Sequence, residues 1–273
     1  TLLAILLLAT PSVAQNFTWN GWFGPPESPP LWSGSWPSEG NNYTNGWGNI
    51  WHYSDDPTNQ FPESDSWVLI PAGMDVVVGG QYQPLCGDLT IEPGATVSLP
   101  FSQLSIFGPN LNNNGLIHAT RYTATYGTID LNGDLDISGN GEINLGDGRF
   151  TSWATERAVT VGSGQLIHGA GGFGWEPYGN YHGIALTNNG VIRATNATSS
   201  FSIFATNATN NNLLESTGEA TLILYGNWDN SAGEIIAKDE SEVWLGSFPD
   251  HPCQLDGGIL RTTGSGEILP KSY

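Results

Sequence analysis

The chain has 273 residues and carries seven Lys and Arg against 26 Asp and Glu, which gives a formal net charge of −19. Hydrophobic residues make up 38% and aromatic residues 11% of the chain, a composition that is too apolar for a disordered protein. The acidic excess disfavours nucleic acid and anionic membrane surfaces as partners, because both require clusters of Lys and Arg.

The first part of the chain is apolar over residues 2–10 and is followed by small residues up to Ala14. A short apolar run before small residues is typical of a secretory signal peptide. We therefore expect residues 1–14 to be a signal peptide that lacks its start, and the mature chain to be secreted or at the cell surface. No other segment approaches the ~20 apolar residues of a spanning helix, so only an anchor outside this sequence would hold it at a membrane.

Residues 15–66, together with Trp67, contain seven of the eleven Trp and are dense in Pro and Gly. No run of five residues in this segment has the character of a strand. We interpret it as an irregular cap over one end of the fold that follows, because native proteins cover exposed strand edges and aromatic side chains bury about 150–250 Å² each. The alternative is a carbohydrate-binding surface.

From Trp67 onward, short runs of β-forming residues are separated every few positions by Gly, Asn or Pro. Apolar and polar residues alternate within several runs, as in Ile129-Asp130-Leu131, which is the period of a half-buried strand. No clear helical pattern of ten residues intervenes. The sequence therefore predicts an all-β domain over residues 67–273 that continues beyond them.

A six-residue unit recurs at irregular spacing within this domain. Asn-Gly-Leu-Ile-His-Ala at 114–119 reappears in similar form at 189–194 and 232–237, and more weakly at 257–262. We expect Gly to supply a positive φ at a tight corner, and Asn side chains to stack in ladders. The fifth position, which is His in the first copy and Arg in the second, is expected to face solvent. Turns of about 22 residues that cover one another predict a right-handed parallel β-helix, or β-solenoid, with insertions.

The segment from Trp67 to Ile106 (WVLIPAGMDVVV, LTIEPGATVSL and QLSI), followed by the Asn-Gly-x-Ile units, resembles secreted bacterial right-handed β-helix proteins. Autotransporter passengers and haemagglutinin-like surface proteins share this order of strand, Pro-Gly turn, strand and Asn-Gly-x-Ile. The resemblance covers about residues 67–269 and implies an elongated, secreted or surface-exposed protein. It implies no catalytic residue, and the irregular period departs from the family pattern and leaves room for a large side loop.

The two cysteines, Cys86 and Cys253, lie near opposite ends of the predicted solenoid. An even number of cysteines in an exported chain favours a disulfide. About eight turns would however separate them by roughly 35 Å, far beyond the ~7 Å between Cα atoms that a disulfide allows. The solenoid prediction therefore requires unpaired cysteines, and a disulfide between them would contradict it.

An Asp-rich stretch of the chain comprises Asp130, Asp134, Asp136 and Asp147. β-Helix polysaccharide lyases and glycosidases place Asp residues on one face, often with Ca²⁺ or Arg, and paired carboxylates can cleave a glycosidic bond. The four residues are thus the candidate catalytic residues, with weak Ca²⁺ binding at Asp134 and Asp136 as a further option. The simpler interpretation is that they face water or accept hydrogen bonds in turns.

Residues 168–182 (HGAGGFGWEPYGNYH) are interpreted as a Gly-rich insertion whose rings would stack on sugars. The candidate ligand-binding residues are Phe173, Trp175, Tyr178 and Tyr181. Packing of these rings over the solenoid is the alternative. His168, Glu176 and His182 form a weaker candidate metal site, because their spacing matches no zinc pattern.

Nucleophile elbows, zinc-protease motifs, P-loops and dinucleotide fingerprints do not occur in the sequence. We therefore favour a non-enzymatic, extracellular solenoid module that acts as a stalk, an adhesin-like surface or a glycan-binding scaffold. Its expected partners are polysaccharides or cell-surface glycans, and Ca²⁺ is the one cofactor considered. The alternative is a β-helix lyase or hydrolase that uses the Asp130–Asp147 stretch, although few Lys and Arg are present to neutralise an acidic substrate.

Overall fold

The computed structural model describes residues 16–18, 33–35, 64, 67–78, 85–100, 102–122, 125–152, 156–174, 183–248 and 251–272. Every regular element in these ranges is a strand, and the described residues contain no helix. Two strand pairs, β11–β12 and β26–β27, are antiparallel, while all the other pairs are parallel. The prediction of an all-β fold is confirmed.

One sheet has ten strands, and successive strands of this sheet come from successive turns of the chain. They are β2 (Ser33–Ser35), β4 (Asp75–Val77), β7 (Thr96–Leu99), β10 (Leu116–Ala119), β15 (Glu142–Asn144), β18 (Leu166–Gly169), β21 (Val191–Ala194), β23 (Leu213–Ser216), β25 (Glu234–Lys238) and β29 (Ile259–Thr263).

A second sheet of eighteen strands forms two further faces, because two long strands bend from one ladder into the other. These are β22 (Phe201–Asn210) and β24 (Thr221–Asp229). The first ladder also holds β1 (Asn16–Thr18), β3 (Trp67–Ile70), β6 (Leu89–Ile91), β9 (Asn110–Asn113), β14 (Leu135–Ser138), β17 (Arg157–Val161), β20 (Ile184–Asn188) and β28 (Gln254–Asp256). The second ladder also holds β5 (Leu85–Cys86), β8 (Gln103–Ile106), β13 (Thr128–Leu131), β16 (Arg149–Thr151), β19 (Gly171–Phe173), β26 (Glu242–Phe248) and β30 (Glu267–Ser272).

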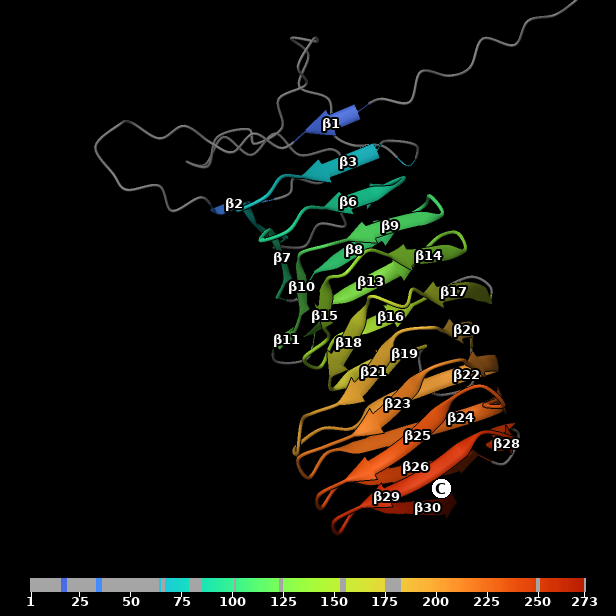
Figure 1. Cartoon of the computed structure of the whole chain (residues 1–273). Coiled ribbons are helices and arrows are strands. Elements are labelled where there is room, and N and C mark those ends of the chain that lie inside the picture. Colours follow the sequence, from blue (N-terminus) through green and yellow to red (C-terminus); the bar gives the residue numbers. More distant parts are fainter. Residues whose placement is uncertain are drawn as a thin grey trace, which may run out of the picture.

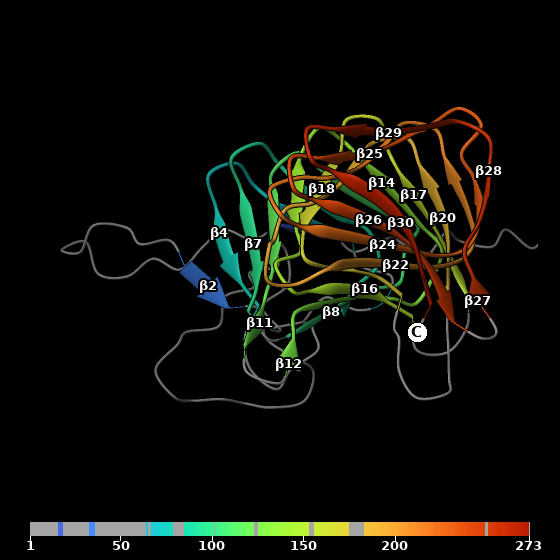
Figure 2. The ribbon, with the colours of Figure 1, turned by 90° about the horizontal axis from the view of Figure 1, so that it is seen from below.

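Each turn of the chain therefore contributes one strand segment to each of three faces, and the turns stack along one axis (Figure 1). Figure 2, which views the molecule from below, shows the three faces enclosing a common interior. Stacked residues lie 20 positions apart between Asn210 and Asn230 and 22 apart between Asn188 and Asn210. The predicted parallel β-solenoid with turns of about 22 residues is confirmed.

The interior is filled by the second residue of most strands in the ten-stranded sheet, together with inward side chains of the other two faces; Leu260 in the last strand, β29, is 47% exposed. In seven of these strands that residue has no exposed surface: Val97, Ile117, Ile143, Ile167, Ile192, Leu214 and Ile235. Such alternation places one side chain in the core and the next in solvent. Each buried aliphatic side chain contributes about 1.5–3 kcal/mol, which makes the stacked column a main source of stability.

A ladder of buried amides runs along one corner of the solenoid. Asn188 Nδ2 donates to Asn210 Oδ1 at 2.8 Å, and Asn210 Nδ2 donates to Asn230 Oδ1 at 2.7 Å. In the N-terminal half, Asn113 instead bonds to Gln165, which reaches across two turns and donates to the Asn113 carbonyl at 2.8 Å. The expected stacking of Asn side chains is confirmed, and each ladder member is buried with its amide satisfied.

At the second position of the repeat unit, the expected positive φ occurs in the weakest copy, at Gly258 (φ 75°), and not in the three stronger copies. Gly115 and Gly190 do not have a positive φ. A Cβ on Gly115 would instead lie 2.3 Å from the carbonyl oxygen of Ala95 in the preceding turn, and one on Gly190 would lie 2.6 Å from that of Gln165. Gly is required here because one turn packs directly on the backbone of the next.

Insertions explain part of the irregular spacing, as predicted. A two-stranded hairpin, β11 (Arg121–Tyr122) with β12 (Thr125–Tyr126), is inserted between β10 and β13, and it projects from the solenoid in Figure 2. A second antiparallel contact joins β26 to β27 (His251–Pro252). At the N-terminal end, β1 and β2 pair with β3 and β4, while most of residues 1–66, with the predicted signal peptide and cap, lies outside the described residues.

Both cysteines are free, as the solenoid prediction requires. Cys86 lies in β5 near one end and is fully buried, whereas Cys253 precedes β28 in the last turn. Burial raises the pKa of the Cys86 thiol above its usual range, and burial raises that of Cys253 to about 11. Neither thiol is set up as a nucleophile at neutral pH.

Candidate functional site

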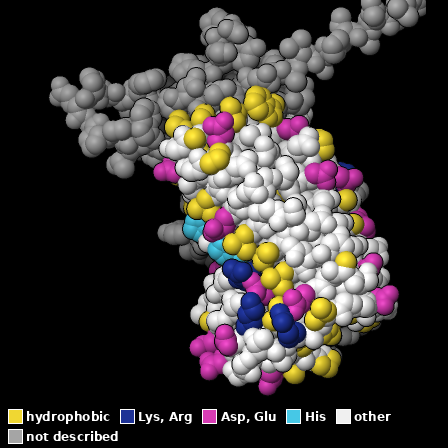
Figure 3. Space-filling view, viewed as in Figure 1, with side chains coloured by type: hydrophobic (Ala, Val, Ile, Leu, Met, Phe, Trp, Pro, Cys, Tyr) yellow, Lys and Arg dark blue, Asp and Glu magenta, His cyan; other side chains and the backbone are white. Residues whose placement is uncertain are grey.

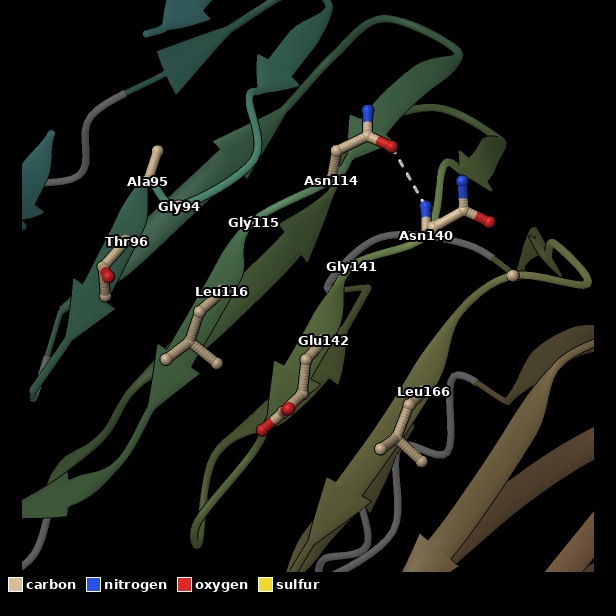
Figure 4. Close-up of a pocket in the computed structure, with 11 residues that line it drawn as sticks. Gly94, Ala95, Thr96, Asn114, Gly115, Leu116, Asn140, Gly141, Glu142 and Leu166 are labelled. Atoms are coloured by element: carbon tan, nitrogen blue, oxygen red, sulfur yellow. Dashed lines mark hydrogen bonds between the residues drawn. The ribbon is translucent and has the colours of Figure 1, made fainter. Parts of the chain in front are cut away.

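The outer face of the ten-stranded sheet contains an open groove of about 460 Å³ that crosses β7, β10, β15 and β18 (Figure 4). Its floor is a row of side chains from the first residue of each strand, which the parallel register aligns. The row consists of Thr96, Leu116, Glu142 and Leu166. Because neighbouring strands lie ~4.8 Å apart, the floor offers side chains at a regular interval along the solenoid.

One wall of the groove is formed by the turns that lead into these strands. Asn114 and Asn140 stand at successive turns, and the backbone N–H of Asn140 donates to Asn114 Oδ1 at 3.1 Å (Figure 4). Each Asn is followed by a glycine, Gly115 or Gly141, so the wall between the two amides is bare backbone. The groove therefore combines amide and peptide groups at its edge with two Leu side chains on its floor.

Glu142 and His168 form an ion pair at this groove. Glu142 Oε1 and His168 Nε2 are 2.6 Å apart, and the Glu142 side chain is 46% exposed whereas that of His168 is 18% exposed. The two residues come from β15 and β18, which are neighbours in the sheet. The contact holds the Glu142 carboxylate in one position at the groove, where it can accept hydrogen bonds from a ligand.

Toward the C-terminal end, the same face carries a carboxylate between two cations. Glu215 on β23 bonds Arg193 on β21 through Nε, and its Oε2 lies 2.6 Å from Lys238 Nζ on β25. The Glu215 side chain is 1% exposed, while Arg193 and Lys238 are each 36% exposed. Burial by itself would raise the pKa of Glu215, but the hydrogen bonds and charges of Lys238 and Arg193 outweigh it and hold the pKa below its usual value.

A fourth ion pair joins Arg261 Nη2 to Glu234 Oε1 at 2.7 Å, again on this face. Three of the seven Lys and Arg of the chain, Arg193, Lys238 and Arg261, thus lie on one face of one sheet. Figure 3 shows the His, Lys and Arg side chains following one another along the solenoid. On an otherwise acidic chain, this face is where positive charge is concentrated.

A second hollow of about 420 Å³ lies on the first ladder over β22, β24 and β28. Its outward side chains are short and polar or acidic: Asn207, Thr209, Asn227, Asp229, Gln254 and Asp256. Ser231 donates hydrogen bonds that hold the pKa of Asp229 below its usual value. The lining of this hollow contains no Lys, Arg or His, whereas the outer face of the ten-stranded sheet carries Arg193 and Lys238.

The four Asp proposed from the sequence do not converge on one face. Asp130 lies on β13 and is 5% exposed, with Asn132 Nδ2 donating to it at 2.9 Å. Burial raises its pKa, and its hydrogen bonds only partly offset that shift. Asp134 and Asp136 are exposed around the start of β14, and Asp147 lies in the connection between β15 and β16.

The aromatic candidates are divided between the core and residues that the structure does not describe. Phe173 lies on β19 with no exposed surface, and its ring stacks on Phe150 with centroids 4.8 Å apart and planes 5° apart. Its ring therefore serves the core in this structure. Trp175, Tyr178 and Tyr181 lie outside the described residues, as do Glu176 and His182 of the weaker metal proposal.

Sequence reasoning missed Glu142, Glu215 and Lys238 as site residues, although it placed His118 and Arg193 at one solvent-facing position of the repeat. That position is confirmed, because His118, Asn144, His168 and Arg193 follow one another in register on the outer face. The missed residues could have been identified from the register between successive turns. Partners 22 to 26 residues apart become neighbours once the turn length is known.

Comparison of the chain with protein-family models, with curated proteins and with solved structures found no match. Within the described ranges, no three or more His, Cys, Asp or Glu side chains gather as a metal site would require. No helix in the described part of the chain has the length and hydropathy needed to cross a membrane.

Proposed function

We propose that this protein is an extracellular, structural or adhesin-like β-solenoid module that binds an extended glycan along the outer face of its ten-stranded sheet. The observation that carries the proposal is the groove of about 460 Å³ across β7, β10, β15 and β18. Its volume lies within the ~300–1,000 Å³ of typical ligand sites. Export remains a prediction from residues 1–14, which lie outside the described residues.

The groove matches the chemistry of a sugar chain. Sugar hydroxyls both donate and accept hydrogen bonds, and the amides of Asn114 and Asn140 and the carboxylate of Glu142 supply the complementary groups. The apolar side chains of Leu116 and Leu166 can pack against the C–H faces of the sugar rings. A linear polymer also suits a site whose groups repeat along an axis.

The site needs little rearrangement to bind, because it stands on a stack of paired strands rather than on a mobile loop. Ile117, Ile143 and Ile167 anchor three of the four strands of the groove in the core and have no exposed surface. Ligand-binding groups that are already in position avoid part of the entropic cost of association. This supports a binding role for the face.

The proposal is tested by measuring retention of residues 15–273 on a panel of neutral and acidic polysaccharides, with release of new chain ends recorded in parallel. Glu142→Gln and Asn140→Ala should weaken binding about tenfold and about fivefold, since each removes one or two hydrogen bonds to the ligand. Asp256→Asn, an equally conservative change at an exposed carboxylate of the first ladder, is the control and should bind as the wild type does.

Failure of every glycan to bind would refute the proposal. Equal losses of binding for Asp256→Asn and Glu142→Gln would place the site elsewhere. If the wild type releases new chain ends and Asp130→Asn or Asp136→Asn does not, the protein cleaves polysaccharides with the Asp130–Asp147 stretch. That result would replace the binding proposal.

A further inference from the structure

We propose that the glycan is acidic and that its carboxylates bind along the cationic row formed by Arg193, Lys238 and Arg261. The proposal rests on the function proposed above and adds the chemical class of the ligand. The three cations lie on β21, β25 and β29, which continue the same outer face beyond the groove. They make this face the place where an anion would be attracted to a chain of net charge −19.

The charge on the row is not fully cancelled within the protein. Arg193 and Lys238 share a single carboxylate, that of Glu215, so this group of three carries one excess positive charge. Glu215 stays ionised at neutral pH because its pKa is below the usual value. Arg261 is paired one to one with Glu234, so the three cations of the row and these two carboxylates sum to +1 on a chain of net charge −19.

The arrangement also directs the two cations outward. Glu215 is 1% exposed and so lies beneath Arg193 and Lys238, which are each 36% exposed. Its bond to Arg193 uses Nε, so the Nη edge of the guanidinium is the part that can meet a ligand carboxylate in two parallel hydrogen bonds. Glu215 is in this view a positioning residue that a ligand does not touch.

The groove leads directly to this row. The floor residue Leu166 pairs in register with Val191, and His168 pairs with Arg193, where β18 adjoins β21. A chain lying in the groove and running toward the C-terminal end of the solenoid therefore reaches Arg193 next. Arg193 and Lys238 lie on strands two turns apart, and their charged groups converge on the two oxygens of Glu215, so neighbouring carboxylates of a polymer can meet both.

The experiment compares each of three uronate polymers, alginate, polygalacturonate and hyaluronate, with its own carboxyl-reduced form, which keeps the backbone and removes the charge. Binding to residues 15–273 is measured by calorimetry at low and at moderate salt. We expect at least one acidic polymer to bind roughly tenfold or more tighter than its reduced form, because it gains charge-assisted hydrogen bonds. Salt should reduce this difference in affinity, because it screens exposed charges. Polyglutamate, an acidic peptide, should bind more weakly than that polymer.

Variants that each remove one positive charge then identify the cations that bind the polymer. Arg193→Gln and Lys238→Gln should each weaken binding of the acidic polymer about fivefold to tenfold and leave binding of the reduced form unchanged. Lys271→Gln removes the same charge where Lys271 lies over the Trp244 ring on another face, and it should have no effect beyond twofold. Thermal unfolding verifies that each variant is folded, and the wild-type comparison of acidic and reduced polymers does not depend on any variant.

The outcomes separate this inference from the function it builds on. If neutral glycans bind and every acidic polymer binds no tighter than its reduced form, the inference is wrong while the proposed function stands. If no glycan binds, the proposed function itself fails. Tighter binding of polyglutamate would point to an acidic protein partner instead, and equal effects of Lys271→Gln and Arg193→Gln would show that only net charge matters.

Discussion

The outer face of the ten-stranded sheet is organised differently in its two halves. In the N-terminal half, β7, β10, β15 and β18 leave an open groove with one exposed ion pair, Glu142 with His168. In the C-terminal half, the buried carboxylate of Glu215 lies between Arg193 and Lys238. Yet the inward residues of both halves are the same kind of fully buried aliphatic side chain.

This difference shows how the solenoid separates folding from function. The inward positions are constrained by the packing of each turn on the next, so both halves repeat them. The outward positions carry no such constraint and are free to form a groove in one half and a charged row in the other. Changes to buried groups should therefore cost stability, whereas changes to exposed outward groups should alter binding.

The largest expected effect comes from a buried group that the stacking of turns requires. Asn210→Ala removes the bonds to Asn188 and Asn230, takes one hydrogen-bond partner from each of these buried amides and leaves a cavity, which should lower the free energy of unfolding by about 3 kcal/mol. The neighbouring Asn211 makes its bond to Asn189 in solvent, so Asn211→Ala should cost under about 0.5 kcal/mol. Urea titration of both variants provides the measurement, and similar losses would contradict the assignment of inward and outward roles.

The next prediction compares the stability cost of neutralising one carboxylate in each half. Glu215→Gln should lower the free energy of unfolding by about 2 kcal/mol, because a buried acceptor of two charged hydrogen bonds becomes neutral. Glu142→Gln, at a side chain that is 46% exposed, should change it by under about 0.5 kcal/mol. If the exposed residue proved the more costly one, the assigned burial of these two ion pairs would be wrong.

The pH dependence sharpens the same contrast. The pKa of Glu215 is lower in the folded state than its ordinary value of 4.5, so its stabilising contribution is fully present above that value and is lost as the pH falls through the folded pKa. The stability difference between wild type and Glu215→Gln should therefore be constant from pH 6 to 8 and shrink as the pH falls below 4.5. Chemical unfolding at several pH values measures it, and a difference that grows on acidification would refute the assignment.

The smallest effect concerns the two thiols, which mark opposite ends of the solenoid. Cys86 is fully buried with a raised pKa, and the pKa of Cys253 is raised to about 11, so both should react slowly with iodoacetamide at pH 8 until urea unfolds the chain. Cys253→Ser should be nearly neutral in stability. Mass spectrometry without reductant gives the decisive check, since a native Cys86–Cys253 disulfide is incompatible with their axial separation.

The fold could be predicted because its determinants are local and repeated. The Asn-Gly-x-Ile units and the alternation within short strands report the turn and the inward positions of every copy. The site could not be predicted in the same way, because its residues meet only through register. Glu142 and His168 are 26 residues apart, whereas Arg193 and Glu215 are 22 apart, and insertions make these separations irregular.

Closeness in sequence was misleading for the carboxylates for the same physical reason. Asp130 and Asp136 are six positions apart, but the chain turns a corner between β13 and β14, so the two residues belong to different faces. The role of Gly in the repeat was also misjudged, because the need for close contact with the previous turn depends on a neighbour about twenty residues away.

The most direct test of a ligand-binding outer face is hydroxyl-radical footprinting of the protein with and without saturating alginate. We predict protection of Leu116, Leu166 and Val191, on the groove floor and its continuation, with no change at Phe107, which is 39% exposed on the second ladder side. Protection at Leu255 in the second hollow, or uniform protection over the surface, would contradict the assignment of the site to the ten-stranded sheet.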